Sequence, residues 1–219
     1  MTQLAIALLC LVPAVLCYTN GPPVSSNADL CTDMLPDGHN GGVSLASDQA
    51  NPPYTITTSA TEYAAGGAVQ VTITGSASDQ FKGFFIQARR ADPARNNDVA
   101  IGTFSRIPGN TQLLVCHNVA NSAWGHSNSE ARTSATATWT APGLDEGPVE
   151  FRATIVKGEP NRNYFYLNVK SSKLNFTNEA PPVSDGTTSS PSNGVGHIVN
   201  DAVTTISVVM AVFVHSRFY

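Results

Sequence analysis

Basic residues are absent from the first third of this chain. Between Tyr18 and Asp79 every charged side chain is acidic, and Lys and Arg appear only from Lys82 onward. The formal net charge of −4 therefore conceals a basic second half. Nucleic-acid-binding proteins carry a much larger basic excess, usually gathered on one surface. We therefore expect no nucleic-acid partner.

The first 17 residues lack charge of either sign. Their apolar run from Leu4 to Leu16 is too short to cross a bilayer but has the length of a secretory signal. A buried N-terminal helix is the alternative, and it is disfavoured because Pro13 interrupts the run and no helical periodicity follows. We predict a signal peptide at residues 1–17 and an extracellular, secreted protein.

Cysteine is scarce as well. Removal of the signal peptide leaves two of the four cysteines, Cys31 and Cys116. In an exported chain such a pair most simply forms one disulfide, and two free buried thiols are the alternative that an oxidising compartment disfavours. Two cysteines cannot build a structural zinc site, and three of the five histidines, His39, His117 and His126, lack the close paired spacing of zinc ligands. We expect no metal and no cofactor.

Catalytic motifs are missing from the sequence. It contains no Gly-x-Ser-x-Gly elbow, no His-Glu-x-x-His and no phosphate-binding glycine loop. The three histidines, together with Ser127 and nearby acids, could in principle assemble a triad, because triad members come from distant parts of a chain. Such combinations arise by chance in chains of this length. We expect His117 to lie at a strand end on the surface, and we expect the protein not to be an enzyme.

The middle of the chain has no long segment of helical periodicity, and short β-like segments take its place. They alternate between apolar and polar residues and are separated by Gly, Pro and Asn turns. The expected strands are residues 54–58, 68–74, 84–90, 99–104, 112–116, 132–139, 149–157 and 163–169. This pattern predicts an all-β protein, an antiparallel β-sandwich that is immunoglobulin-like in broad shape. The Cys and Trp spacing of antibody domains is absent, which excludes a true immunoglobulin domain.

The segment 84–90 is expected to be the central strand. Read at period two, one of its faces is fully apolar, and the other, with Phe85, Gln87 and Arg89, is mixed. A strand with one side in a sandwich core has this pattern. The simplest interpretation is a core strand with no further role, and the basic residues at its end suggest a second interpretation.

An ordered series of short motifs runs along most of the mature chain. In order, the motifs are Cys31 with Met34-Leu35-Pro36 and His39, Pro52-Pro53-Tyr54, Tyr63-Ala64-Ala65-Gly66, residues 81–89, Ile101-Gly102-Thr103-Phe104, the Cys116 strand, Thr138-Trp139-Thr140-Ala141-Pro142 and residues 149–154. Together they cover about residues 29–169, and in this order they resemble a reeler domain. The resemblance implies an immunoglobulin-like sandwich without enzymatic activity. It also supports the pairing of Cys31 with Cys116.

The reeler family includes modules of large extracellular and membrane proteins as well as small secreted defence proteins such as noduler. A reeler domain behind a signal peptide is similar to the small defence proteins in architecture. The resemblance therefore implies an innate-immune protein that binds microbial cell-wall glycolipids or other surface components. The alternative is an extracellular adhesion or matrix module that binds sulfated glycans. A redox partnership with a membrane reductase has no support beyond family kinship.

Beyond the expected domain at residues 18–175, two further segments are predicted. Residues 176–201 are rich in Pro, Ser, Thr and Gly and should form a disordered stalk. Residues 202–219 contain an apolar stretch too short to span a bilayer, which indicates a lipid-anchor signal and a possible membrane tether. A final β-strand or an unprocessed tail is the alternative. Asn175, in an Asn-Phe-Thr sequon, is a predicted glycosylation site.

The candidate ligand-binding residues are Arg89, Arg90 and Arg95. They are close in sequence, at the end of the central strand and in the loop that follows. Arginine is rarely buried unpaired, so we expect these side chains to reach the surface and to bind phosphate or sulfate groups through forked hydrogen bonds. The alternative is that they pair with Asp92, Asp98 or the acidic first half of the chain.

Overall fold

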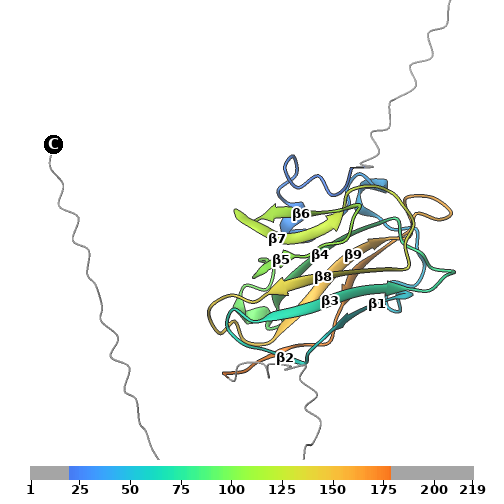
Figure 1. Ribbon diagram of the computed structural model, residues 1–219. Coiled ribbons are helices and arrows are strands. Elements are labelled where there is room, and N and C mark those ends of the chain that lie inside the picture. Colours follow the sequence, from blue (N-terminus) through green and yellow to red (C-terminus); the bar gives the residue numbers. More distant parts are fainter. Residues whose placement is uncertain (1–19, 179–219) are drawn as a thin grey trace, which may run out of the picture. The chain divides into compact units, whose positions relative to one another are not determined.

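The computed structural model describes residues 20–178, in which two antiparallel β-sheets pack face to face (Figure 1). The first sheet, with order β1-β3-β8-β5, consists of β1 (Tyr54–Thr58), β3 (Ala68–Gly75), β8 (Ser134–Thr140) and β5 (Thr103–Ser105). The second sheet, with order β10-β9-β4-β7-β6, consists of β10 (Phe165–Lys170), β9 (Val149–Val156), β4 (Gly83–Arg90), β7 (Val119–His126) and β6 (Thr111–Cys116). The predicted all-β sandwich is confirmed. The predicted signal peptide, the apolar tail and most of the stalk lie outside the described residues.

Short elements complete the fold. β2 (Glu62–Tyr63) and β11 (Asn175–Phe176) pair in parallel at one end of the sandwich. The helical pieces are α1 (Leu30–Asp33), η1 (Asn40–Gly42) and η2 (Pro93–Arg95). Of these, α1 matters most for the site because it lies against the outer face of the second sheet through its buried residues Leu30 and Cys31.

The core between the sheets is rich in aromatic side chains. Trp124 packs against Phe84 with ring centroids 4.7 Å apart, and Trp139 packs against Phe151 at 5.4 Å. Period-two alternation in β3 and β8 produces this core by directing every second residue inward. The outward residues of the first sheet are mainly threonines, such as Thr72 and Thr136, whose hydroxyl oxygens are 2.9 Å apart.

Both faces of β4 are buried, which corrects the expectation of a half-exposed central strand. Residues 20–46, called here the N-terminal segment, cover the outer face of the second sheet. A second hydrophobic cluster forms there from Leu30, Cys31, Met34, Phe85, Ala100, Leu114, Cys116 and Ala123. The two-residue alternation along β4 correctly separates its two faces. It cannot show that a segment distant in sequence covers the face of mixed polarity.

β7 is absent from the expected strands because its turn carries an unusual residue. Cys116 pairs with Val119, so the hairpin between β6 and β7 is closed by the two residues His117 and Asn118. Both have positive φ, 53° and 62°, which is the geometry of tight hairpin turns that Asn and Gly usually supply. A histidine in the first turn position conceals this signal in the sequence.

The strand expected at residues 99–104 begins only at Thr103. Gly102 has φ of +65°, and a Cβ at this position would lie 2.4 Å from the Trp139 indole nitrogen. The same indole donates a hydrogen bond of 3.0 Å to the Ile101 carbonyl oxygen. The backbone therefore bends around Trp139 before the strand starts.

Candidate binding site

A disulfide between Cys31 and Cys116 fixes the N-terminal segment to the second sheet. It joins α1 to the end of β6, with the two Cα atoms 5.4 Å apart, and both residues are buried. The pairing agrees with the sequence expectation. The bridge spans 85 positions of sequence, so it links the start of the domain to the edge of the sheet it covers.

Buried hydrogen bonds hold the same segment in place. The Cys31 carbonyl oxygen accepts from Gln87 Nε2 at 3.1 Å and from Arg89 Nη2 at 2.7 Å. The Thr154 hydroxyl donates to the Met34 carbonyl oxygen at 2.7 Å. These donors project from the outer faces of β4 and β9, so they satisfy the backbone of a segment that has little regular structure of its own.

Arg89 is buried, with 3% of its surface exposed, so the expectation that its head reaches the surface is wrong. Besides Cys31, its guanidinium donates to Gln87 Oε1 at 2.9 and 2.7 Å. Burial, reinforced by the nearby positive charge of Arg152, lowers the pKa of Arg89 to about 10, and the acids Asp98 and Asp33 oppose this effect. Arg89 is therefore an internal support of the N-terminal segment.

The other two candidate arginines do not join Arg89. Arg90 forms an ion pair of 2.6 Å with Glu146, both side chains being largely buried. The partner is thus neither of the aspartates considered above. Arg95 is exposed, and its Nη2 is 3.5 Å from the Asp145 carbonyl oxygen. The three arginines therefore do not form one accessible cluster.

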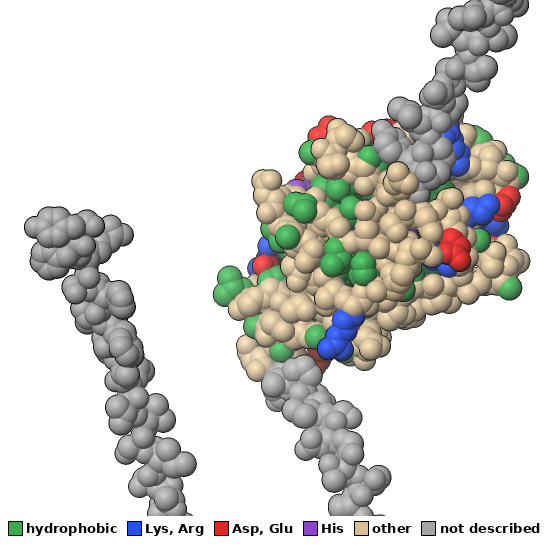
Figure 2. Space-filling model, turned by 45° about the horizontal axis from the view of Figure 1, so that its top comes forward, with side chains coloured by type: hydrophobic (Ala, Val, Ile, Leu, Met, Phe, Trp, Pro, Cys, Tyr) green, Lys and Arg blue, Asp and Glu red, His purple; other side chains and the backbone are tan. Residues whose placement is uncertain are grey.

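Other cations of the second sheet are also paired. Glu150, itself buried, accepts from Arg152 at 2.7 Å and from Lys170 at 2.9 Å. Burial works against ionisation of Glu150, but the hydrogen bonds from Lys170 and Arg152 outweigh it and lower its pKa. On the face shown in Figure 2, charged side chains are sparse and scattered. That face presents no concentrated basic patch.

The three histidines make different contacts and do not form a triad. His117, in the β6–β7 turn, accepts a hydrogen bond from the Ala100 amide at 3.2 Å and lies 3.3 Å from the Thr32 hydroxyl. His39 Nδ1 bonds the Arg162 carbonyl oxygen. His126 lies at the end of β7, and its Nδ1 is 3.0 Å from both the amide nitrogen and the carbonyl oxygen of Phe84.

A pocket of about 320 Å³ opens between the N-terminal segment and the second sheet. One wall comes from the N-terminal segment, and the floor comes from the ends of β4, β7 and β9. The lining residues are Gly21, Pro22, Pro23, Asn27, Leu30, Met34, Leu35, Pro36, Asp37, Gly38, His39, Phe84, Phe85, His126, Thr154 and Val156. Its volume is within the range of small-molecule sites.

The polar groups of the pocket are mostly engaged already. Asn27 donates to the Asp37 carboxylate at 3.1 Å, and the Thr154 hydroxyl is bound to the N-terminal segment. Burial lowers the pKa of His126, and Arg132 adds to the effect, while the hydrogen bond with Phe84 opposes it. His126 is therefore neutral at pH 7, and the pocket is mainly apolar.

His39 and His126 are both candidates from the sequence, but nothing in the sequence signals that they share this pocket. The proline pairs Pro22-Pro23 and Leu35-Pro36 are compatible with an irregular segment over a sheet. The covering of β4 could be inferred only from Cys31, because its disulfide requires this segment to lie beside β6.

Asn175 is exposed in β11, where its amide donates to the Thr61 carbonyl oxygen. It thus lies in a short strand, and not after the last strand as expected. Its exposure is compatible with glycosylation, which stays a prediction.

The described part of the chain contains no group of three or more His, Cys, Asp or Glu side chains arranged to hold a metal ion. Between residues 20 and 178 no helix is long and apolar enough to cross a membrane.

Comparison with known families decides the identity of this sandwich. Residues 29–182 match the Reeler domain family. The chain belongs to the reeler family. The match begins just before Cys31, so it includes the N-terminal segment from residue 29 onward, the disulfide and all of the strands described above.

Relatives of this reeler protein differ in their total length. A protein of Antheraea mylitta, named as a candidate defense protein, is 36% identical over 66% of this chain and 86% of its own length. A similarly named protein of Bombyx mori is 35% identical over 71% of this chain and 84% of its own length. A Danio rerio protein, named as a candidate ferric-chelate reductase, is 34% identical over 72% of this chain, but the match spans only 25% of that protein.

Solved reeler domains are also similar to this chain. The crystal structure of the human F-spondin reeler domain has a TM-score of 0.47 and 24% identity, covering 57% of this chain and 89% of that structure.

Proposed function

We propose that this reeler protein is an extracellular defence protein that binds components of microbial surfaces and catalyses no reaction. The relatives that match it over most of their own length are named for defence, and this supports a defence role. The reductase-named relative is four times longer than its match to this chain, so its activity is not transferred. A buried disulfide that joins the N-terminal segment to β6 is consistent with an oxidising, extracellular location.

The observation that carries this proposal is the open pocket at one end of the sandwich. It is mainly apolar with a few polar groups at its margin, which is the usual character of a ligand site. The pairing and burial of Arg89 and Arg90 leave little support for an anion site at the end of β4. We therefore assign recognition to the pocket rather than to those arginines.

Binding to whole bacteria and to sulfated-glycan beads, measured side by side with the purified secreted protein, tests the proposal. We expect retention on bacteria that persists at high salt, because burial of apolar surface is not screened by ions. Retention on the glycan beads alone, lost at high salt, would contradict the proposal and favour an adhesion or matrix module.

A further inference from the structure

The pocket is suited to a hydrocarbon chain. Leu35 and Val156 contribute to its walls, and none of the described residues that line it is Lys or Arg. Because the Asn27 amide and the Thr154 hydroxyl are already bonded within the protein, a ligand gains little from new hydrogen bonds inside. Most of the gain comes from removing apolar surface from water.

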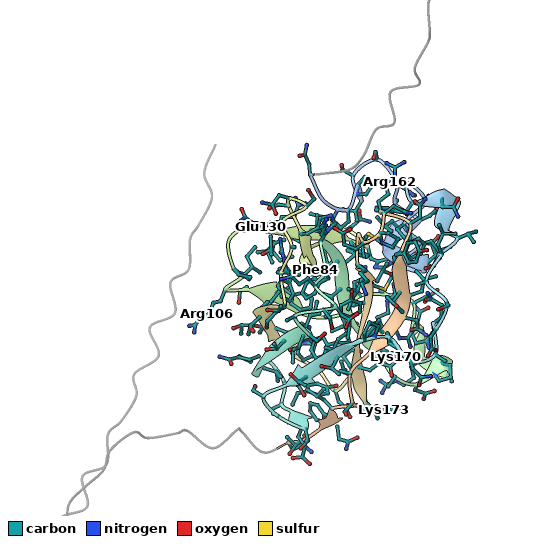
Figure 3. The ribbon with its side chains drawn as sticks, turned by 90° about the vertical axis from the view of Figure 1, so that its right-hand side faces the viewer. Phe84, Arg106, Glu130, Arg162, Lys170 and Lys173 are labelled. Carbon is teal, nitrogen blue, oxygen red and sulfur yellow. A yellow bond between two sulfur atoms is a disulfide. The ribbon has the colours of Figure 1, made fainter. Side chains whose placement is uncertain are left out.

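One arginine has its backbone beside the pocket. The backbone of Arg162 is one hydrogen bond away from His39, which lines the pocket. Within the part of the chain that the structure describes, the Arg162 guanidinium has no hydrogen bond or ion pair. In Figure 3, Arg162 lies at one end of the molecule, and Lys170 and Lys173 lie toward the other. A guanidinium in this position is a natural partner for a phosphate group.

We propose that the pocket binds one acyl chain of an anionic amphiphile, whose phosphate is held at the rim by Arg162. The inference rests on the proposed function, because it names the chemical class that the protein would recognise on a microbial envelope. The apolar walls select the chain and Arg162 selects the charge of the headgroup. The ligand enters at the end of the sheet where Gly83 and Phe165 pair with Val156.

Chain length provides the first test. Saturated lysophosphatidic acids of increasing length are titrated into the full secreted protein by calorimetry, below their micelle concentrations. Each methylene that enters the pocket should tighten Kd by about fourfold, until the pocket is full and the increase stops. Glycerol phosphate, which has the headgroup without the chain, should bind far more weakly. An affinity independent of chain length overturns the proposal.

Matched variants locate the chain. Leu35→Glu places a carboxylate in the apolar wall and should weaken binding at least tenfold. Leu144→Glu is the same change at a position that is 74% exposed and outside the pocket, and it should leave Kd unchanged. Equal effects of the two changes overturn the proposal. If Leu35→Glu lowers the melting temperature, Val156→Phe fills the same space without adding charge and should shorten the longest chain accepted.

A second pair of variants locates the headgroup. Arg162→Ala should weaken the phosphate amphiphile about tenfold and leave an alkyl maltoside of equal chain length unaffected, since the maltoside carries no charge. Arg95→Ala removes an exposed guanidinium outside the pocket, and it should change the affinity for neither ligand. If Arg162→Ala weakens the binding of the maltoside and of the phosphate amphiphile to the same extent, the proposed role of the guanidinium is overturned.

The two proposals fail in different ways. Retention on bacteria without any amphiphile binding would overturn the acyl-chain site and leave the proposed function standing. Amphiphile binding without retention on bacteria would overturn the proposed function and leave the site standing.

Discussion

Arg89 shows how one side chain can look like a ligand-binding residue in the sequence and serve as an internal support in the fold. Its guanidinium donates to the Gln87 side chain and to the Cys31 carbonyl oxygen, both of which are neutral, so its burial depends on these hydrogen bonds. Arg95, six residues later, is exposed and makes one long contact.

Replacing Arg89 by Ala should lower the free energy of unfolding by about 3 kcal/mol, because the buried Gln87 Oε1 loses the guanidinium donor and the Cys31 oxygen loses one of its two donors. Arg95→Ala should change it by less than about 0.5 kcal/mol. Urea denaturation followed by tryptophan fluorescence measures both. A surface role for Arg89 would be indicated if the two variants were equally stable.

His126 makes stability depend on pH. Burial lowers its pKa in the folded state below the ordinary value of 6.5, so the unfolded chain takes up a proton first as the pH falls. Well above pH 6.5 both states are neutral at this residue and no penalty exists. Below it, the free energy of unfolding should decrease until the pH reaches the lowered pKa.

The free energy of unfolding, measured by denaturation at several pH values, should therefore decrease as the pH falls from about 7.5 to about 5. This window follows from the ordinary histidine pKa. His126→Asn keeps an acceptor for the Phe84 amide and should flatten part of the slope. Burial also lowers the pKa of His117, which leaves a residual slope in that variant. An unchanged slope would show that His126 does not carry the effect.

At the scale of elements, the N-terminal segment is a cover attached to a finished sandwich. Its cluster contains Leu30, Met34 and Phe85 and is separate from the core between the sheets. Gly125 of β7 approaches it so closely that a Cβ there would lie 2.9 Å from the Pro22 side chain. The N-terminal segment is therefore packed tightly, although little of it forms a helix or a strand.

Replacing both Cys31 and Cys116 by Ala should reduce the free energy of unfolding by about 4.6 kcal/mol, the chain-entropy value for a loop of this length. The effect should be greatest in the cover, because the bridge links it to β6 and the core between the sheets does not depend on it. Hydrogen exchange should show faster exchange in α1 and in β6 than in β3 and β8. Uniform acceleration across both sheets would contradict a separable cover.

At the scale of the whole molecule, the pocket and the C-terminal strand lie at opposite ends of the second sheet. Val156 of β9 lines the pocket, and Val149, at the other end of β9, bridges to Leu174 just before β11. At about 3.3 Å per residue these ends are roughly 23 Å apart. Gly21 and Pro22, by contrast, line the pocket directly.

The protein captured on a sensor surface through a tag placed directly after Asn178, two residues beyond β11, should thus bind the amphiphile fully. Capture through a tag directly before Tyr18 should reduce the active fraction, because the attachment lies close to the pocket. Surface plasmon resonance with equal captured mass measures both. Equal active fractions in the two orientations would contradict this placement.

The sequence by itself determined the elements whose information is local. Alternation gave β1, β3 and β8 close to their observed bounds because each buries every second residue. The bounds of β9 also followed from its alternating sequence, although the fold buries both of its faces. Export and the count of two cysteines predicted the disulfide, and the ordered motifs predicted the family. β7 was missed because a His-Asn turn carries no familiar hairpin signal.

Only the tertiary structure decided where charges and the pocket lie. Whether Arg89 faces water depends on a segment more than fifty positions away, and that information is not local. Arg90 could have met several acids, and the register of β4 with β9 set it beside Glu146. The pocket likewise exists because a bridge holds Cys31 against β6, so that His39 and His126, distant in sequence, come to line one space. Contacts between segments distant in sequence determine which of several equivalent partners each charged side chain meets.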